Sequence, residues 1–216
     1  MFTGIVREIG NMSAVERRDD ILHLTIECPG IRPGIAEGDS IAVEGCDLTA
    51  AALTQTGFRC DVTKETLART TLGELRAGSK VNLEPSLTPS TPISGHFVLG
   101  HIDGVGTIRS LKRGGDQAEL VVAAPLELMK FIAQKGSIAI SGVGLTVVVV
   151  LHDSFSCWLI PYTLEHTTLG SVRSGGKVNL EVDVLARYIV RALEAGVKPV
   201  GETITEEFLQ EHGFGS

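Results

Sequence analysis

Two histidines are the side chains in this sequence best suited to acid–base chemistry at neutral pH. His96 and His101 lie five residues apart in a run, 95–104, that also contains three glycines. Successive side chains of a strand point to opposite faces, so this spacing separates the imidazoles and argues against a shared metal ion. An imidazole that titrates near neutrality serves instead as an acid or a base. The glycines allow close backbone approach, so the run predicts part of a ligand site.

The cysteines predict no metal centre. Their spacing is wide, without a Cys-x-x-Cys pair, and this disfavours structural zinc and iron–sulfur clusters. The four positions are Cys28, Cys46, Cys60 and Cys157. Cys60 and Cys157 lie in alternating or apolar runs, where a buried cysteine acts as a small hydrophobe. We therefore expect reduced thiols.

The chain contains an internal repeat. A shift of 97 residues aligns 40–84 with 137–181 without a gap, and nearly half of the aligned positions are identical. A shift of 96 residues extends the match toward the N-terminus, where Gly4 pairs with Gly100. A repeat of this length predicts two homologous halves, and they meet near residues 86–92.

The duplication has a functional consequence, because two similar halves are expected to bind two similar ligands. Thr49 and Thr146 occupy equivalent places after a glycine turn, although a structural threonine in a strand also explains them. His101 aligns with Ile5, so the histidine breaks the internal symmetry where an apolar side chain suffices in the other half. This asymmetry favours a functional role for His101.

The elements that must position these residues are mostly strands. Short alternating or β-branched runs at 22–26, 40–43, 58–62 and 80–83 are separated by Gly- and Pro-bearing turns. About six such strands in each half indicate a small closed barrel. We therefore predict an all-β protein of two barrels, with domains at 1–90 and 91–182 and a C-terminal helix and tail at 183–216.

Helical spacing is confined to a few segments. The strongest runs from Asp183, a plausible N-cap, to Ala195, with Gly196 at its end. Its broad apolar face predicts packing either on its own barrel or against copies of itself. A helix is also predicted at 125–135, with a shorter counterpart near 30–37 and another short helix at 205–211.

Composition limits the class of partner. The formal net charge is -7, with acids and bases interspersed, which argues against a nucleic-acid surface or a polybasic membrane anchor. The first residues lack the pattern of a signal peptide, and no apolar run has the length needed to span a bilayer. We expect a cytoplasmic protein that acts on a small molecule.

Several motifs together resemble the riboflavin synthase family, which includes the related lumazine proteins. They cover about residues 1–200 and are specific as a set. The motifs are the opening Met-Phe-Thr-Gly-Ile, the run 95–104, two Leu-Thr turns, Lys64-Glu65-Thr66-Leu67, the run 159–164, two Thr-Thr-Leu-Gly runs and the run 179–183. The resemblance implies tandem six-stranded Greek-key β-barrels and a homotrimer whose C-terminal helices form a central bundle.

The resemblance also implies a reaction and a set of site residues. Two molecules of dimethyl-ribityl-lumazine bind face to face, and one gives four carbons to the other, yielding riboflavin and a ribitylamino-pyrimidine without cofactor or metal. Thr3, Gly4 and Ile5 approach the ligand from the N-terminus, Thr49 and Lys64 line the first pocket, and His101, Gly144, Thr146, Ile160 and Thr163 serve the second. His101 and Thr146 are the acid–base candidates, and Asp47 and Cys46 are further catalytic candidates.

Two pocket positions depart from the family pattern. Asp47 stands where the family has a Cys, Gly144 where it has a Ser, and Glu44 and Ser141 stand where it has Asn and Asp. Asp47 aligns with Gly144 and Glu44 with Ser141, so both pockets are altered at equivalent places. The alternatives are lineage variation within a working synthase, a non-catalytic lumazine- or flavin-binding protein, and a pocket in which Glu44, Cys46 and Asp47 serve another ligand or a metal.

Overall fold

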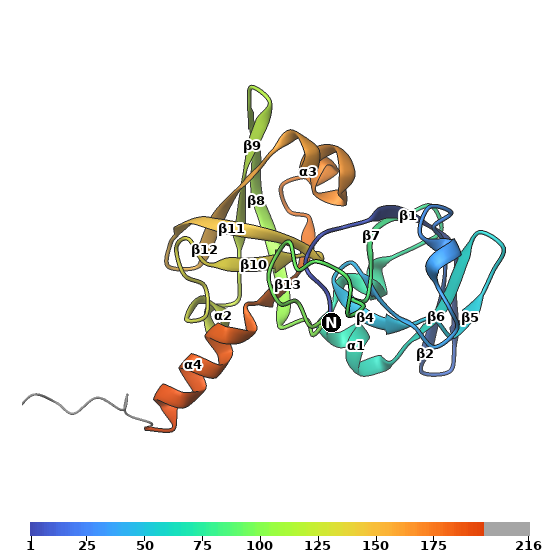
Figure 1. The fold of residues 1–216 in the computed structure, drawn as a ribbon. Helices are drawn as coiled ribbons and strands as arrows, with labels where there is room; N and C mark the ends of the chain where they lie inside the picture. Colours follow the sequence, from blue (N-terminus) through green and yellow to red (C-terminus); the bar gives the residue numbers. More distant parts are fainter. Residues whose placement is uncertain (197–216) are drawn as a thin grey trace, which may run out of the picture.

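The computed structural model describes residues 1–196. Two β-rich halves lie side by side, the N-terminus lies between them, and one helix projects from the second half (Figure 1). Within the described residues, no helix is long and apolar enough to cross a membrane. The arrangement confirms the predicted tandem barrels and C-terminal helix.

The first half forms one twisted antiparallel sheet in the order β4-β3-β7-β1-β2-β6-β5. Its strands are β1 (Glu8–Arg18), β2 (Ile21–Glu27), β3 (Ser40–Val43), β4 (Cys46–Thr49), β5 (Ala52–Leu53), β6 (Gly57–Val62) and β7 (Lys80–Pro85). The connections carry η1 (Arg32–Gly34), α1 (Lys64–Arg69) and η2 (Thr71–Glu74). Strand β2 alternates strictly, with Leu22, Leu24 and Ile26 facing the core, as period-two patterning predicts.

The second half is a closed barrel in the order β10-β11-β12-β9-β8-β13. Its strands are β8 (Gly104–Gly114), β9 (Gln117–Ala123), β10 (Ser137–Ile140), β11 (Val143–Val150), β12 (Ser154–Leu159) and β13 (Lys177–Val182). Helix α2 (Leu126–Met129) lies between β9 and β10, while α3 (Pro161–His166) and η3 (Thr168–Ser171) lie between β12 and β13. Both connections join strands that are not neighbours, as in a Greek key.

A single interruption makes the first half an open ring. Strands β4 and β5 together match the continuous strand β11 of the second half. Between them, the N–H of Ala50 donates to the Asp39 carbonyl, as that of Val147 donates to Gly136 in the second half, and the N–H of Ala51 donates to the Arg59 carbonyl of β6. The two ends of the seven-stranded sheet are therefore consecutive in the chain.

Each half has its own apolar core. Phe58 and Phe155 lie at equivalent positions in the two cores, as do Cys60 and Cys157, and all four are fully buried. A third, small cluster of Phe2, Ala42, Val98 and Ala139 lies apart from both. All four cysteines are free and buried, as expected for structural thiols.

The helix prediction is correct at 183–195 and wrong in extent at 125–135. Helix α4 (Val184–Glu194) begins after Asp183, whose carboxylate accepts from the N–H of Leu185 at 2.9 Å. By contrast, α2 has one turn, because Leu128 and Ile132 turn into the barrel core and the chain continues with i→i+3 hydrogen bonds. The helix predicted at 205–211 lies outside the described residues.

Candidate functional site

The N-terminal segment and the segment that enters the second half cross each other between the barrels. Phe2 donates its N–H to the Val98 carbonyl at 2.7 Å, and Val98 donates back to Phe2 at 3.1 Å. This antiparallel bridge directs each segment over the other half of the molecule. The Gly4 carbonyl accepts from the N–H of Gly144 at 2.8 Å, and the Gly100 carbonyl accepts from the N–H of Asp47 at 2.9 Å.

The first candidate site is a hollow of about 220 Å³ at the turn before β4. Its lining residues are Cys46, Asp47, Glu65, Thr66, Arg69, Thr70, Gly100, His101 and Ile102. The Asp47 side chain is half-buried, and His101 is exposed at the rim. The sequence prediction put His101 in the second pocket; the structure places it at the first, because the crossing carries residues 99–102 over the β3–β4 turn.

The second candidate site is the equivalent turn before Thr146. Gly144 has no side chain there, and a Cβ added to it would lie 3.2 Å from Nδ1 of His96. Burial lowers the pKa of His96, while Asp183 acts in the opposite direction, so the imidazole is neutral at physiological pH. The two histidines of the run 95–104 thus lie at different turns.

The other residues predicted from the sequence do not all converge on these turns. Thr49 and Thr146 are exposed and pair with Ser40 and Ser137 on the neighbouring strands. Lys64 lines a separate hollow with Arg17, Asp20, Leu67 and Ala68. Ile160 is the exposed residue before α3 and Thr163 lies half-buried within it. Thr3 is buried, and its hydroxyl donates to Glu84 at 2.7 Å, while Ile5 is half-buried.

Cys46 is poorly suited to nucleophilic chemistry. Its side chain is buried, and burial together with the nearby carboxylates of Asp47 and Glu181 raises the pKa of its thiol to about 12. The thiolate is the nucleophilic form of cysteine. Cys46 is therefore protonated at neutral pH and packs as part of the first core.

Glu44 does not join Asp47 and Cys46 in one pocket. Its carboxylate turns into the interface between the halves, where Oε1 accepts from the N–H of Asn82 at 2.8 Å and from the Thr168 hydroxyl at 3.2 Å. Burial raises the pKa of Glu44 to about 7, although these hydrogen bonds act against the shift. Among residues 1–196, no group of three or more His, Cys, Asp or Glu side chains could hold a metal ion.

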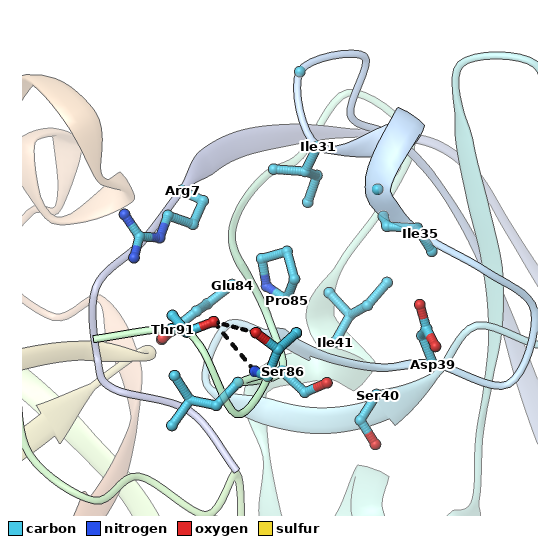
Figure 2. A pocket seen from close by; sticks show the side chains of 14 residues that line it. Arg7, Ile31, Ile35, Asp39, Ser40, Ile41, Glu84, Pro85, Ser86 and Thr91 are labelled. Atoms are coloured by element: carbon cyan, nitrogen blue, oxygen red, sulfur yellow. Dashed lines mark hydrogen bonds between the residues drawn. The ribbon is translucent and has the colours of Figure 1, made fainter. Parts of the chain in front are cut away.

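A further hollow lies away from both turns. It has a volume of about 470 Å³ and lies between η1, the start of β3 and the chain after β7. Figure 2 shows the aliphatic side chains of Ile31, Ile35 and Ile41 around it, with Arg7 at one side and Asp39 at another. No imidazole lines this hollow, so the acid–base candidates remain at the turns.

Comparison with known proteins identifies the architecture. The model of the lumazine binding domain matches the chain twice, at residues 3–86 and 99–183. The chain belongs to the lumazine-binding domain family. Each match covers one of the two halves, so the internal repeat is a repeat of this domain.

Several relatives of this chain are named riboflavin synthase. The chain is 37% identical to riboflavin synthase of Bacillus subtilis, with 99% of this chain and 100% of the relative covered. It is 41% identical to that of Mycobacterium tuberculosis, with 90% of this chain and 99% of the relative covered. The relative from Photobacterium phosphoreum is 36% identical, with 99% of both chains covered.

Solved structures of LumP share the fold. LumP complexed with riboflavin has a TM-score of 0.80 and 27% sequence identity, covering 84% of this chain and 99% of LumP. LumP complexed with 6,7-dimethyl-8-(1'-D-ribityl) lumazine has a TM-score of 0.77 at the same identity and coverage. The lumazine-binding domains of this protein thus resemble both synthases and a lumazine- and flavin-binding protein.

The sequence reasoning missed the polar residues that join the two domains. Asn82 and Asn179 are equivalent, at most 1% exposed, and each reaches into the other half. Oδ1 of Asn82 accepts from the N–H of Thr168 at 2.8 Å, and Oδ1 of Asn179 accepts from that of Thr71 at 2.8 Å. The available signal was the repeated Val-Asn-Leu-Glu, in which polar residues interrupt a buried strand.

Proposed function

We propose that this protein is a riboflavin synthase. It binds two molecules of dimethyl-ribityl-lumazine and transfers a four-carbon unit from one to the other, giving riboflavin and a ribitylamino-pyrimidine. The reaction is a dismutation, so it needs no external oxidant or reductant. The observation that carries the proposal is the pair of equivalent turns in one chain. The chain also matches relatives named riboflavin synthase over nearly their whole length.

At the first turn, His101 and Asp47 are the proposed acid–base groups. Both line the same hollow, with Arg69 on another side. A lumazine bound there must lose a proton from an acidic methyl group, and an imidazole or a carboxylate within hydrogen-bond reach can accept it. Thr146 is the proposed polar contact at the second turn, with Gly4, Gly144 and the neutral His96 beside it.

We also propose that the active assembly is a homotrimer built on α4. Four apolar side chains of this helix are 56–72% exposed: Leu185, Tyr188, Ile189 and Leu193. An apolar stripe of this kind favours helix–helix association. Association would bring the first-domain hollow of one subunit near the second-domain turn of another, as the resemblance to the synthases implies.

A second candidate is a non-catalytic lumazine- or flavin-binding protein. The observation that favours it is the pair of departures at the turns, Asp47 and Gly144, combined with the structural similarity to LumP complexed with lumazine and riboflavin. Such a protein holds its ligand tightly, whereas a synthase releases its product.

The deciding experiment is incubation of the purified full chain with dimethyl-ribityl-lumazine, followed by riboflavin absorbance and analysis of the ligand that remains bound after gel filtration. Turnover that falls by at least about tenfold in His101→Gln is expected for the synthase. A bound chromophore without riboflavin formation favours the binding protein and overturns the synthase. If the protein neither binds the lumazine nor turns it over, both proposed functions are contradicted.

A further inference from the structure

Two buried glutamates each hold a pair of consecutive main-chain N–H groups. Oε1 of Glu181 accepts from Leu99 at 2.6 Å and Oε2 accepts from Gly100 at 2.9 Å. In the other half, Oε1 of Glu84 accepts from Thr3 at 2.7 Å and Oε2 accepts from Gly4 at 3.0 Å. Both side chains are at most 4% exposed. A carboxylate that accepts two N–H bonds through different oxygens fixes the position and orientation of a segment.

Each glutamate holds a segment that reaches across the boundary between the domains. Glu181 belongs to β13 of the second domain, and the segment it holds contributes Gly100 and His101 to the hollow of the first. Gly100 completes the link, because its N–H binds Glu181 while its carbonyl accepts from Asp47. Its φ of +81° suits glycine, and an added Cβ would lie 2.5 Å from that of Asp47.

The second domain also holds the segment beyond His101. Arg187 of α4 donates to the His101 carbonyl at 3.2 Å and pairs with Asp103 at 2.5 Å. Asp103 in turn accepts from the N–H of Val182 at 2.9 Å. His101 therefore lies between two anchors, Glu181 before it and Arg187 after it, and both belong to the second domain and its helix.

We propose that Glu181 is a positioning residue for the ligand hollow of the first domain, where it fixes His101 and the Gly100 carbonyl relative to Asp47. Glu84 has the equivalent role at the second turn, through Thr3 and Gly4. The binding arm of the test below rests on the proposed function, since it requires that the first hollow binds the ligand; the structural arm does not.

The protonation state of Glu181 changes what it can hold. Burial raises the pKa of Glu181 to about 7, with the N–H bonds of Leu99 and Gly100 opposing, Asp103 raising and Arg187 lowering it. The buried Cys46 thiol also faces this carboxylate. A protonated carboxyl has one O–H donor, so it cannot accept both N–H groups equally well. The hold on residues 99–100 therefore weakens as pH falls below about 7.

The structural arm uses amide NMR on the full chain without ligand. In the unaltered protein, the amide protons of Leu99 and Gly100 are expected to titrate together between pH 5.5 and 8.5, with the Asp47 amide following. Glu181→Gln removes this titration, while Glu84→Gln leaves it in place. Amide resonances of residues 99 and 100 that Glu181→Gln leaves unchanged at pH 8, in a variant whose remaining amide spectrum is that of the folded protein, would overturn the proposal.

The binding arm measures riboflavin affinity in a double-mutant cycle. Glu181→Gln is expected to weaken binding about tenfold, and by less than about twofold once His101 is alanine. The effects of Glu84→Gln and His101→Ala on the free energy of riboflavin binding are expected to be additive. Equal coupling of both glutamates to His101 would overturn the positioning role. Absence of riboflavin binding by the unaltered protein would contradict the proposed function, while the NMR titration still tests the positioning.

Discussion

The two domains have the same main-chain contacts at their turns and different side chains there. Asp47 and Gly144 both donate an N–H to a glycine of the crossing segment, at 2.9 and 2.8 Å. Glu44 and Ser141 are both in the left-handed region, with φ of 49° and 46°. Yet the first domain presents two carboxylates at these places and the second presents none. The duplicated geometry thus fixes the backbone and leaves the side chains free to differ.

Residue pairs that are identical in the two domains lie at different places from pairs that differ. Two pairs that remain identical bind main-chain groups: Asn82 and Asn179 hold one domain to the other, and Glu84 and Glu181 hold the crossing segments. Pairs that differ, such as Asp47 with Gly144 and Ile5 with His101, lie at the turns. Two turns of similar backbone but unequal charge suit the proposed reaction, in which two identical molecules have different roles.

The largest expected effect comes from breaking the contact between the two glycine turns. Gly142→Ala would put a Cβ 2.8 Å from the backbone nitrogen of Gly45, at a φ of +79°. Backbone strain and overlap together are expected to cost about 3 kcal/mol of unfolding free energy, measured by urea denaturation. Gly114→Ala, which has nothing within 4 Å, is the control. If Gly142→Ala loses no more unfolding free energy than the control, the close contact between Gly142 and Gly45 is contradicted.

An intermediate effect is expected where Glu44 breaks the symmetry. Its pKa is about 7 in the folded protein and near 4.5 when unfolded, so the folded state binds the extra proton between these values. Stability contributed by the protonated form is therefore lost as pH rises through this window. Glu44→Gln keeps an acceptor and cannot ionise, so it is expected to be more stable than the unaltered protein at pH 8, by on the order of 2 kcal/mol.

The measurement is the thermal midpoint of both proteins from pH 5 to pH 8. The difference between them isolates Glu44 from Glu181 and Glu84, which titrate in both proteins. It also isolates Glu44 from Glu74, Lys80 and Lys177, which line with it a hollow of about 290 Å³ between the domains. A difference that stays constant with pH contradicts the buried, protonated Glu44.

The smallest effect concerns an ion pair that only one side of the interface has. Glu74 of the first domain pairs with Lys177 of the second, and both side chains are more than half exposed. At the equivalent positions of the repeat, Ser171 replaces Glu74 and Lys80 replaces Lys177, and both line the hollow that contains Glu44. We expect Glu74→Ala to lose less than about 1 kcal/mol and Ser171→Glu to gain a similar amount. Both changes should diminish in high salt; persistence there would indicate packing instead.

The fold was largely predictable from the sequence, because a duplicated strand pattern admits few arrangements. The alternation in 22–26 and the cap at Asp183 located β2 and α4 correctly. The helix at 125–135 was overestimated because apolar residues at helical spacing, Leu128 and Ile132, also suit a loop that closes a barrel. The break between β4 and β5 falls where β11, 97 residues later, has a register irregularity of its own between Val147 and Val149.

The site residues named from the sequence stay a prediction, but the structure shows how they are grouped. The sequence indicated His101 and the two Leu-Thr turns and grouped His101 with the second pocket, whereas His101 lines the hollow at the first turn. Sequence adjacency groups residue 101 with the strands of the second barrel, whereas hydrogen bonds to Glu181 and Asp47 decide its place. Such contacts between residues some 50 to 80 positions apart cannot be deduced from local pattern alone.

The crossing of the two entry segments also bears on how such domains can be recombined. A chimera that joins halves from two relatives at the linker would combine the first segment of one parent with the second turn of the other, and vice versa. Both Gly4–Gly144 and Gly100–Asp47 would then be hybrid contacts. Moving residues 1–7 with the second barrel and residues 95–103 with the first would keep these two contacts parental, but the contacts of Thr3 with Glu84 and of Leu99 with Glu181 would then be hybrid. The crossing segments therefore belong to both barrels, and no single junction preserves every contact.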